Sequence, residues 1–209
     1  MIYNPLDLEN KNIPNYEEGF NSVKYPLESF KESAARIGII NQTLDEDGII
    51  RRSPLIYGFQ DELLPHAALA SYLVSKNLID SSISDITNNF IFGDDGTYLI
   101  RWYGESGNLS PFKYYSIHSL FVSAQQLKNN EEPIVPLNTF KGKDIIIGGT
   151  AFGLLDHKAV PIYSNSPYPG MEITATILSN IKNKHFIYSA DKFNVYIIVF
   201  IFAFIMSVT

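Results

Sequence analysis

The sequence predicts an α/β fold, a single domain whose mixed sheet is flanked by helices. Short runs of β-branched residues alternate along the chain with segments whose apolar residues recur at helical spacing, and such interleaving is typical of α/β layers. The 209 residues are 45% hydrophobic, which is enough to bury a sizeable core. An uncharged apolar run after Lys192 predicts the start of a transmembrane helix behind that domain.

Three regions divide the chain. Residues 1–30 show no hydrophobic periodicity and predict an extended lead, whose polar first part contains no signal peptide. Residues 31–190 form the predicted domain. Residues 193–209 are apolar over about 16 positions, against the roughly 20 that a span needs, so they predict a truncated transmembrane helix. A soluble core helix that is apolar on every side is the alternative.

The first half of the domain predicts two strands and a helix. Residues 36–40 favour a strand, and Asp47-Gly48 predicts a tight turn, because glycine accepts a positive φ and aspartate can bond its own backbone. Residues 53–59 alternate as a strand does. Residues 64–76 predict a helix with Pro65 in its first turn. Its buried stripe would comprise Ala68, Leu69, Tyr72 and Leu73.

The second half predicts a hairpin, a helix, a buried strand and a last helix. Residues 90–103 suit the hairpin, and Ser116 suits the N-cap of the helix that follows. The apolar stripe of that helix comprises Ile117, Leu120, Phe121, Ala124 and Leu127. Residues 145–147 are three isoleucines, which suit a buried strand that breaks at Gly148-Gly149. A proline-rich loop leads to a helix from Gly170, with Ile173, Ile177, Leu178 and Ile181 at helical spacing.

Composition excludes several kinds of function. The net charge of -6 argues against a nucleic-acid surface, which needs clustered lysine and arginine. The chain has no cysteine, so disulfides, thiolate-bound zinc and a thiol nucleophile are excluded. The lack of cysteine does not fix the compartment.

The motifs that carry catalysis or cofactors are missing. The glycines of residues 148–153 follow the predicted strand, but neither the lysine of a P-loop nor the spacing of a dinucleotide fingerprint accompanies them. Backbone amides there could hold an anion, and a simple tight turn is the alternative. No nucleophile elbow of the G-x-S-x-G type occurs. We therefore expect no catalytic residue and no cofactor.

No metal site is expected either. The four histidines lie far apart without a zinc-binding pattern. His157 is the most interesting of them, because the neighbouring Asp156 could raise its proton affinity; a solvated loop histidine is the alternative. The acids of residues 45–47 lack the spacing of a calcium loop. We expect them to face Arg51 and Arg52 across the turn instead.

Five blocks of sequence carry a resemblance to a known family. The first block is GIIN at residues 38–41 with LDEDGIIRRSPL at 44–55, and the second is HAALA at 66–70. The third is RWYG at 101–104 with Tyr115-Ser116, the fourth is IIIGGTAFGLLD at 145–156, and the fifth is Pro161 with PGMEITA at 169–175. In order and spacing, over roughly residues 30–187, the chain resembles the type-two CHASE domain, a cyclase- and histidine-kinase-associated sensory extracellular domain. Thr174 departs from the histidine that is usual there, and Val160 from the threonine that commonly precedes Pro161.

The resemblance implies an extracytoplasmic sensor domain in the cell membrane. A preceding transmembrane helix, further spans and a cytoplasmic adenylate or guanylate cyclase or kinase would complete such a receptor. The implied partners are a small-molecule or protein signal and a second copy in a homodimer. The apolar run from residue 193 fits the first following span. Lys182, Lys184 and Lys192 argue for the opposite orientation, because basic residues beside a span favour the cytoplasmic side.

A ligand cavity is expected where the Asp47 turn, the Gly148 loop and residues 156–169 converge at a sheet end. The candidate ligand-binding residues are Asp45, Asp47, Arg51, Arg52, Asp156 and Glu172. Their alternative role is to cap turns and the helix that begins at Gly170, where a carboxylate is favoured by the helix dipole. The alternative function is a dimerisation or partner-binding module without a small ligand. An enzyme would require a triad or metal cluster that the sequence lacks.

Overall fold

The computed structural model describes residues 22–59, 62–78, 96–151, 154, 156–162, 168–187 and 192–208. The described elements are α1 (Glu28–Ser33), β1 (Arg52–Pro54), β2 (Ile56–Phe59), β3 (Glu62–Pro65), α2 (Ala67–Ser75), β4 (Thr97–Leu99), the 3₁₀ turns η1 (Gly107–Leu109) and η2 (Leu137–Phe140), α4 (Ile117–Lys128), β5 (His157–Lys158), β6 (Tyr168–Pro169), α5 (Gly170–Asn183) and α6 (Lys192–Val208). Helices and strands are interleaved as predicted, which confirms the mixed α and β class. Helix α1 begins within the lead that was predicted to be extended.

The strands form three two-stranded antiparallel sheets, β1 with β4, β2 with β3, and β5 with β6. Within the described ranges, the single mixed sheet that the sequence predicts is therefore wrong. The strand expected at residues 36–40 is reduced to one parallel bridge, between Ile39 and His66. There the Ile39 N–H donates to Pro65 O at 2.8 Å, and the Ala67 N–H donates to Ile39 O at 2.8 Å. Residues 90–95 of the predicted hairpin lie outside the described residues.

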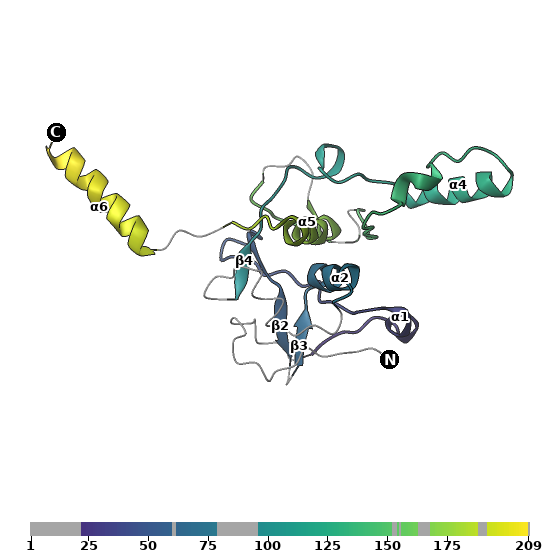
Figure 1. Cartoon of the computed structure of the whole chain (residues 1–209), viewed down its shortest axis with the longest axis horizontal. Helices are drawn as coiled ribbons and strands as arrows, with labels where there is room; N and C mark the ends of the chain where they lie inside the picture. The colour runs from purple at the N-terminus through teal and green to yellow at the C-terminus, as the bar shows by residue number, and fades with distance from the viewer. Residues whose placement is uncertain are drawn as a thin grey trace.

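The core lies between α2 and α5, with β2 and β3 beside α2 (Figure 1). Both predicted helical stripes are confirmed. From α2, Ala68, Leu69 and Leu73 are buried and Tyr72 packs against the core; from α5, Ile173, Ile177, Leu178 and Ile181 are buried. Strand β2 contributes residues from both faces, including Ile56 and Tyr57, and Leu55 between β1 and β2 is also buried. Burial of these apolar side chains is the main stabilising term for the domain.

Helix α2 begins two residues later than Pro65. Pro65 pairs with Ile56 as the last residue of β3, so the prediction of a proline in the first helical turn is wrong. The N-cap is His66, whose Nδ1 accepts a hydrogen bond from the Ala68 N–H at 3.1 Å. An imidazole nitrogen thus satisfies one of the free amides of the first turn.

Helix α5 is tied to the segment after β4 by a buried asparagine. Asn180 Oδ1 accepts from the Arg101 N–H at 2.8 Å, and its Nδ2 donates to Arg101 O and to Tyr103 Oη, both at 3.0 Å. These bonds satisfy the backbone N–H and C=O of Arg101, a residue that lies outside the described helices and strands. The helix ends at Lys184, which adopts a left-handed conformation with φ of 55°.

The buried strand predicted at residues 145–147 is not present. Ile145 and Ile147 are exposed, Ile147 by 85%, and Ile146 alone packs against the core. No strand pairs with this segment in the described part of the chain. Gly148 lies against Met171 in the first turn of α5, and residues 152–153 of the glycine segment that follows lie outside the described residues. Three β-branched residues identified an extended segment, but its pairing depends on partners that the local sequence does not specify.

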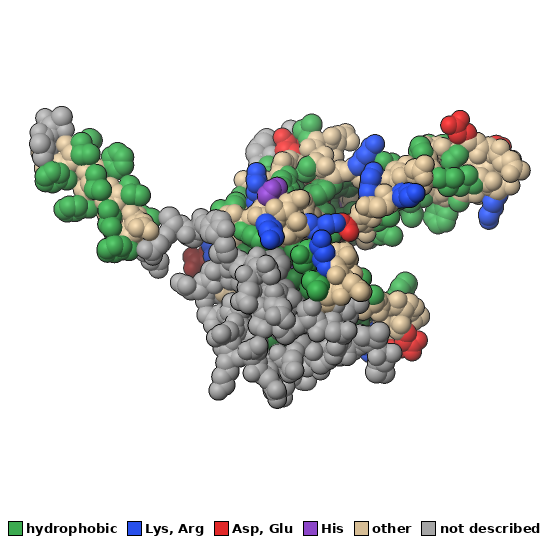
Figure 2. Space-filling view, in the orientation of Figure 1, with side chains coloured by type: hydrophobic (Ala, Val, Ile, Leu, Met, Phe, Trp, Pro, Cys, Tyr) green, Lys and Arg blue, Asp and Glu red, His purple; other side chains and the backbone are tan. Residues whose placement is uncertain are grey.

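Helix α4 and its Ser116 N-cap are confirmed, because Ser116 Oγ accepts from the His118 N–H at 3.2 Å. Its apolar stripe is not buried in the core, because Ile117, Phe121 and Leu127 are exposed. Helix α4 projects from one side of the α2–α5 pair and α6 from the other (Figure 1). The side chains of α6 are exposed and mostly apolar (Figure 2). Among the described residues, no helix is both long and apolar enough to span a bilayer.

Candidate functional site

The turn at residues 45–48 gathers four of the six candidate residues. The Gly48 N–H donates to Asp45 O at 2.8 Å, and Gly48 has a φ of 78°, which glycine adopts without strain. Asp47 Oδ1 accepts from the Ile49 N–H at 3.1 Å, as expected for an aspartate that bonds its own turn. The local chemistry that predicted this turn is confirmed.

Two arginines hold the acids of that turn. Arg51 Nη1 donates to Asp45 Oδ2 at 3.0 Å, and its Nη2 to Asp47 Oδ2 at 2.7 Å. Arg52 Nε lies 3.3 Å from Asp45 Oδ1. The hydrogen bonds that Arg51 donates to Asp47 lower the pKa of Asp47, and its bonds to the Asp47 and Asp45 carboxylates raise the pKa of Arg51. The predicted pairing of acids and arginines is confirmed.

An open hollow of about 560 Å³ lies over this cluster, lined by residues 44–47 with Arg51 and Arg52. The Ile50 N–H donates to Ala159 O at 2.9 Å, so the turn meets residues 156–160 as expected. Neither Asp156 nor Glu172 lines the hollow. This hollow is an open surface depression above the ion pairs of Arg51 and Arg52. The cavity expected where three loops converge stays a prediction, because residues 152–153 and 163–167 of two of those loops lie outside the described residues. Whether its residues contact a ligand stays a prediction.

Asp156 lies at the N-terminus of α5. The Gly170 N–H donates to Asp156 O at 2.9 Å, and the Asp156 carboxylate lies against the Gly170 Cα, leaving no room for a Cβ there. A carboxylate at this position interacts favourably with the amides of the first turn. The neighbouring His157 pairs with Pro169 across β5 and β6. The Asp156 carbonyl thus accepts the first amide of α5, while no side-chain hydrogen bond caps the helix.

Glu172, in the first turn of α5, is buried and accepts two hydroxyl hydrogen bonds. Tyr114 Oη donates to Glu172 Oε2 at 2.6 Å, and Ser110 Oγ donates to Oε1. Ser110 Oγ also accepts from the Phe112 N–H at 3.0 Å. Burial and the bond to Glu172 raise the pKa of Tyr114. Buried carboxylates need such partners, and here they fasten residues 110–114 to α5.

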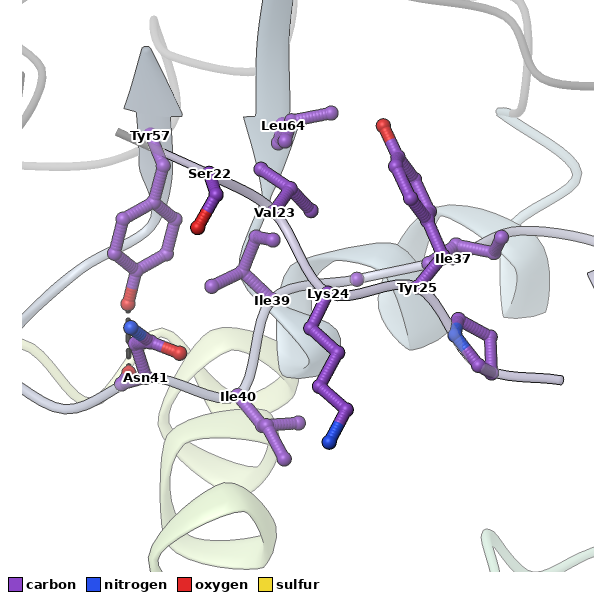
Figure 3. Close-up of a pocket in the computed structure, with 12 residues that line it drawn as sticks. Ser22, Val23, Lys24, Tyr25, Ile37, Ile39, Ile40, Asn41, Tyr57 and Leu64 are labelled. Atoms are coloured by element: carbon purple, nitrogen blue, oxygen red, sulfur yellow. Dashed lines mark hydrogen bonds between the residues drawn. The ribbon is translucent and has the colours of Figure 1, made fainter. Parts of the chain in front are cut away.

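A second cavity, of about 500 Å³, lies away from all six candidates (Figure 3). Residues 22–26 and 37–41 pass along it, and Tyr57 of β2 and Leu64 of β3 complete its wall. The wall is mostly apolar, and Tyr57 Oη, at one end, donates to Asn41 O at 2.7 Å. Its volume and apolar character are those of small-molecule sites.

Sequence reasoning missed this cavity because its two walls are 11 or more residues apart along the chain and join only in the fold. One local signal was available. A Cβ on Gly38 would overlap Ala67, so a glycine is needed for residues 37–41 to lie this close to the start of α2. Gly38 is also the first residue of the first family block.

His66 lies directly behind the cavity and is buried. Its ring stacks on that of Tyr57 with centroids 6.4 Å apart, and burial lowers its pKa to about 4. Because Nδ1 accepts from Ala68, the neutral ring carries its proton on Nε2, 3.3 Å from the Gln42 amide. An amide orientation with Oε1 toward His66 would satisfy that proton and also the otherwise unpartnered Gln42 Oε1.

The mostly apolar cavity lies between residues 22–26, residues 37–41 and strands β2 and β3. The chain belongs to the CHASE2 domain family, whose model matches residues 7–208. The resemblance seen in the sequence is therefore confirmed. CHASE2 domains are sensory and extracellular in type and are not catalytic. The family therefore supports a sensing role for this chain and not an enzymatic one. No curated protein and no solved structure matches the chain.

Proposed function

We propose that this chain is the extracytoplasmic signal-input domain of a bacterial transmembrane receptor, and that it controls a cytoplasmic adenylate or guanylate cyclase or a kinase. The observation that carries the proposal is the apolar cavity of about 500 Å³ in a CHASE2 domain. The ligand is a small, mainly apolar molecule. A polar group on it would meet Asn41 and the Tyr57 hydroxyl at one end of the cavity.

A continuous set of contacts connects the cavity with the end of the domain. Ile39 lines the cavity and is bonded to Pro65 and Ala67 at the start of α2. Helix α2 packs against α5, and the segment after α5 pairs with the sheet at the bridge between Ile187 and Leu99. A ligand that favours one position of residues 37–41 would bias α2 and α5 in proportion to its differential affinity.

Helix α6 is the proposed membrane anchor. Its 17 residues are apolar apart from a few polar positions at its start and end, and its described side chains are exposed, as an isolated span would require of lipid-facing residues. Lys182 and Lys184 precede it and oppose an extracytoplasmic orientation. The family supports that orientation, so the topology needs a direct test.

Ligand binding is tested by thermal unfolding of the full chain in detergent against a panel of amphiphilic and apolar metabolites. We expect at least one compound to raise the melting temperature, since a ligand at 100 times its Kd stabilises by about 2.7 kcal/mol. Val23→Trp, which fills the cavity from residues 22–26, should abolish the shift. Leu109→Trp, at an exposed position outside the cavity, should retain it. Equal shifts in both variants would place the ligand elsewhere.

Location is tested with single cysteines, because the chain has none. Ser71→Cys on the exposed side of α2 should react with a membrane-impermeant maleimide in cells whose outer membrane is permeabilised but whose inner membrane is intact. Labelling that appears only after lysis of the inner membrane would place the domain in the cytoplasm. That result would contradict the proposed location but would not bear on whether the cavity binds a ligand.

The alternative function is a dimerisation or partner-binding module with no small ligand. The exposed apolar face of α4 favours it. A chain that sediments as a stable dimer while no compound shifts its melting temperature would support this function over ligand sensing.

A further inference from the structure

Helix α4 turns its polar side toward its own chain. Ser123 is buried, and its Oγ donates to Ser119 O at 2.7 Å and accepts from the Val135 N–H at 2.9 Å. Gln126 Oε1 accepts from the Ile134 N–H at 2.9 Å. These bonds fasten the returning chain along α4, so residues 116–137 form an ordered arm.

The apolar side of this arm faces outward (Figure 2). Phe121 is 67% exposed, and four more apolar side chains of the arm are at least 40% exposed: Ile117, Leu127, Ile134 and Leu137. In the described part of the chain, α4 has no extensive contact with another helix or strand. An isolated helix of 12 residues is marginal in water, and amphipathic helices draw most of their stability from packing of the apolar face. The apolar face of the arm therefore lacks, in the described part of the chain, the packing that would stabilise such a helix.

We propose that the apolar face of the arm is completed by the same arm of a second copy of this chain, with the two α4 helices antiparallel about a two-fold axis. This interface is separate from the ligand cavity and does not depend on the proposed function. A symmetric contact of one patch with itself is the commonest arrangement of soluble oligomers.

Charge at the two ends of α4 selects the antiparallel orientation. Lys113 precedes the helix, whereas Glu131 and Glu132 follow it, and all three are exposed. Neither carboxylate has an ion-pair partner within the described ranges. Antiparallel helices bring Lys113 of each copy near the two acids of the other, and they also oppose the two helix dipoles. Parallel helices would place like charges together.

The available area suits a homodimer. At these exposed fractions, side chains of this size present on the order of 100 Å² each, so two arms together bury about 1,000 Å², the lower bound for a specific interface. The polar residues do not suit a lipid surface. Helices that lie on membranes carry lysine and arginine along the polar face, whereas α4 has only Lys128 and is followed by two glutamates.

Cross-linking in membranes that contain the full chain tests the geometry. Ala124→Cys places a thiol within the exposed apolar stripe, and Ser71→Cys places one on the exposed side of α2, away from the arm. A bismaleimide that reaches about 8 Å, the closest spacing of packed helices, should link Ala124→Cys chains into dimers and Ser71→Cys chains far less. Equal yields, or none at Ala124→Cys, would overturn the interface. Quenching by brominated lipids of a fluorophore attached to the thiol of the Ala124→Cys variant would assign the face to the bilayer instead.

Two substitutions of the same charge test the energetics in detergent. Phe121→Glu should raise the dimer Kd at least 30-fold, because a buried aromatic anchor commonly contributes that much. Leu109→Glu adds the same charge at an exposed apolar position outside the arm and should change the Kd by less than about 3-fold. The unfolding midpoint of the core should be unaffected in both. An unchanged Kd in Phe121→Glu would overturn the proposal, including the case in which α6 alone holds a dimer.

A charge exchange distinguishes the two orientations. Lys113→Glu alone should weaken the antiparallel dimer several-fold, since like charges then meet at each end. Adding Glu131→Lys and Glu132→Lys to the same chain restores opposite charges at both ends and should restore the Kd. In a parallel pair, each end of α4 lies beside the same end of the second copy. Like charges would then still meet in the triple variant, and the Kd would not be restored.

Discussion

Helices α5 and α4 are both amphipathic, yet they meet opposite surroundings. In α5, the apolar stripe packs against α2, and Ile173 and Ile177 are fully buried. In α4, the corresponding stripe faces outward, and a serine and a glutamine make the contacts to the chain. Periodicity of apolar residues indicates that a helix has a face to cover. It does not indicate whether the same chain covers it.

The α2–α5 core and the arm are also stabilised in different ways. The α2–α5 core is held by buried apolar area and by polar groups that are bonded on all sides, such as Asn180. The arm is held by a few hydrogen bonds of Ser123 and Gln126, and its apolar side is exposed. The core should therefore unfold cooperatively, and the arm at a lower free energy.

The largest contrast is expected from truncating one apolar residue on each helix. Ile177→Ala should lower the free energy of unfolding by about 2–5 kcal/mol, because it removes buried methyl groups and leaves a cavity. Phe121→Ala should change it by less than about 0.5 kcal/mol in the monomer. Denaturant unfolding can be followed by Trp102, the single tryptophan, whose ring packs on Tyr168 with centroids 5.2 Å apart.

The two measurements must be made below the concentration at which the chain dimerises. Ile177→Val serves as the matched control, since it keeps most of the side chain and should lose only about 0.5–1.5 kcal/mol. A loss from Phe121→Ala as large as that from Ile177→Ala would show that the arm is part of the core, and the comparison would fail.

The sequence predicts local features of this fold well. The Asp47-Gly48 turn, the Ser116 cap and both stripes of the α2–α5 core depend on residues within one turn or one helix of each other. Features that depend on distant partners were wrong. Residues 145–147 have the composition of a buried strand, but two of the three isoleucines are exposed and no described strand pairs with them.

The candidate site shows the same limit. The pairing of Arg51 and Arg52 with the acids of the turn follows from spacing and was predicted. The alternative role foreseen for Asp156 and Glu172 was to cap α5, but no side chain caps that helix. Glu172 instead binds Tyr114 and Ser110, which lie 58 and 62 positions away along the sequence. The cavity was missed, because residues 22–26 carry no signal that they face Tyr57 and Leu64.

A smaller contrast is expected from two histidines, one in each region. Burial lowers the pKa of His66 to about 4, against about 6.5 in the unfolded chain. Between these values the unfolded chain binds a proton that the folded chain excludes, so stability rises with pH. The contribution of His66 is fully present above about pH 6.5 and is lost as pH falls to 4, about 3 kcal/mol in total.

Denaturant unfolding at several pH values measures this effect. His66→Gln removes the titrating group, so the stability difference between wild type and variant should shrink as pH falls from 7 to 4. His118→Gln, on the exposed side of α4, should leave the pH dependence as it is in the wild type. If the unfolding free energy of His66→Gln depends on pH as steeply as that of the wild type, other groups produce the dependence, the acids of the chain among them.

The smallest effect should come from the N-cap of α4, and it sharpens the claim that the arm unfolds separately. Ser116 Oγ accepts from the His118 N–H, and loss of such a cap costs about 1 kcal/mol. Helix α5 has no side-chain cap at Pro169 and holds its first turn by packing and by Glu172 instead. Ser116→Ala should therefore lower hydrogen-exchange protection of the α4 amides about 5-fold, while the α5 amides and the Trp102 transition stay unchanged. Ser116→Thr should keep most of the protection, because a threonine hydroxyl can cap the same amide. If Ser116→Ala shifts the Trp102 transition by the full 1 kcal/mol or so, the arm and the core unfold as one unit, and the outward stripe of α4 must then be covered in the folded monomer.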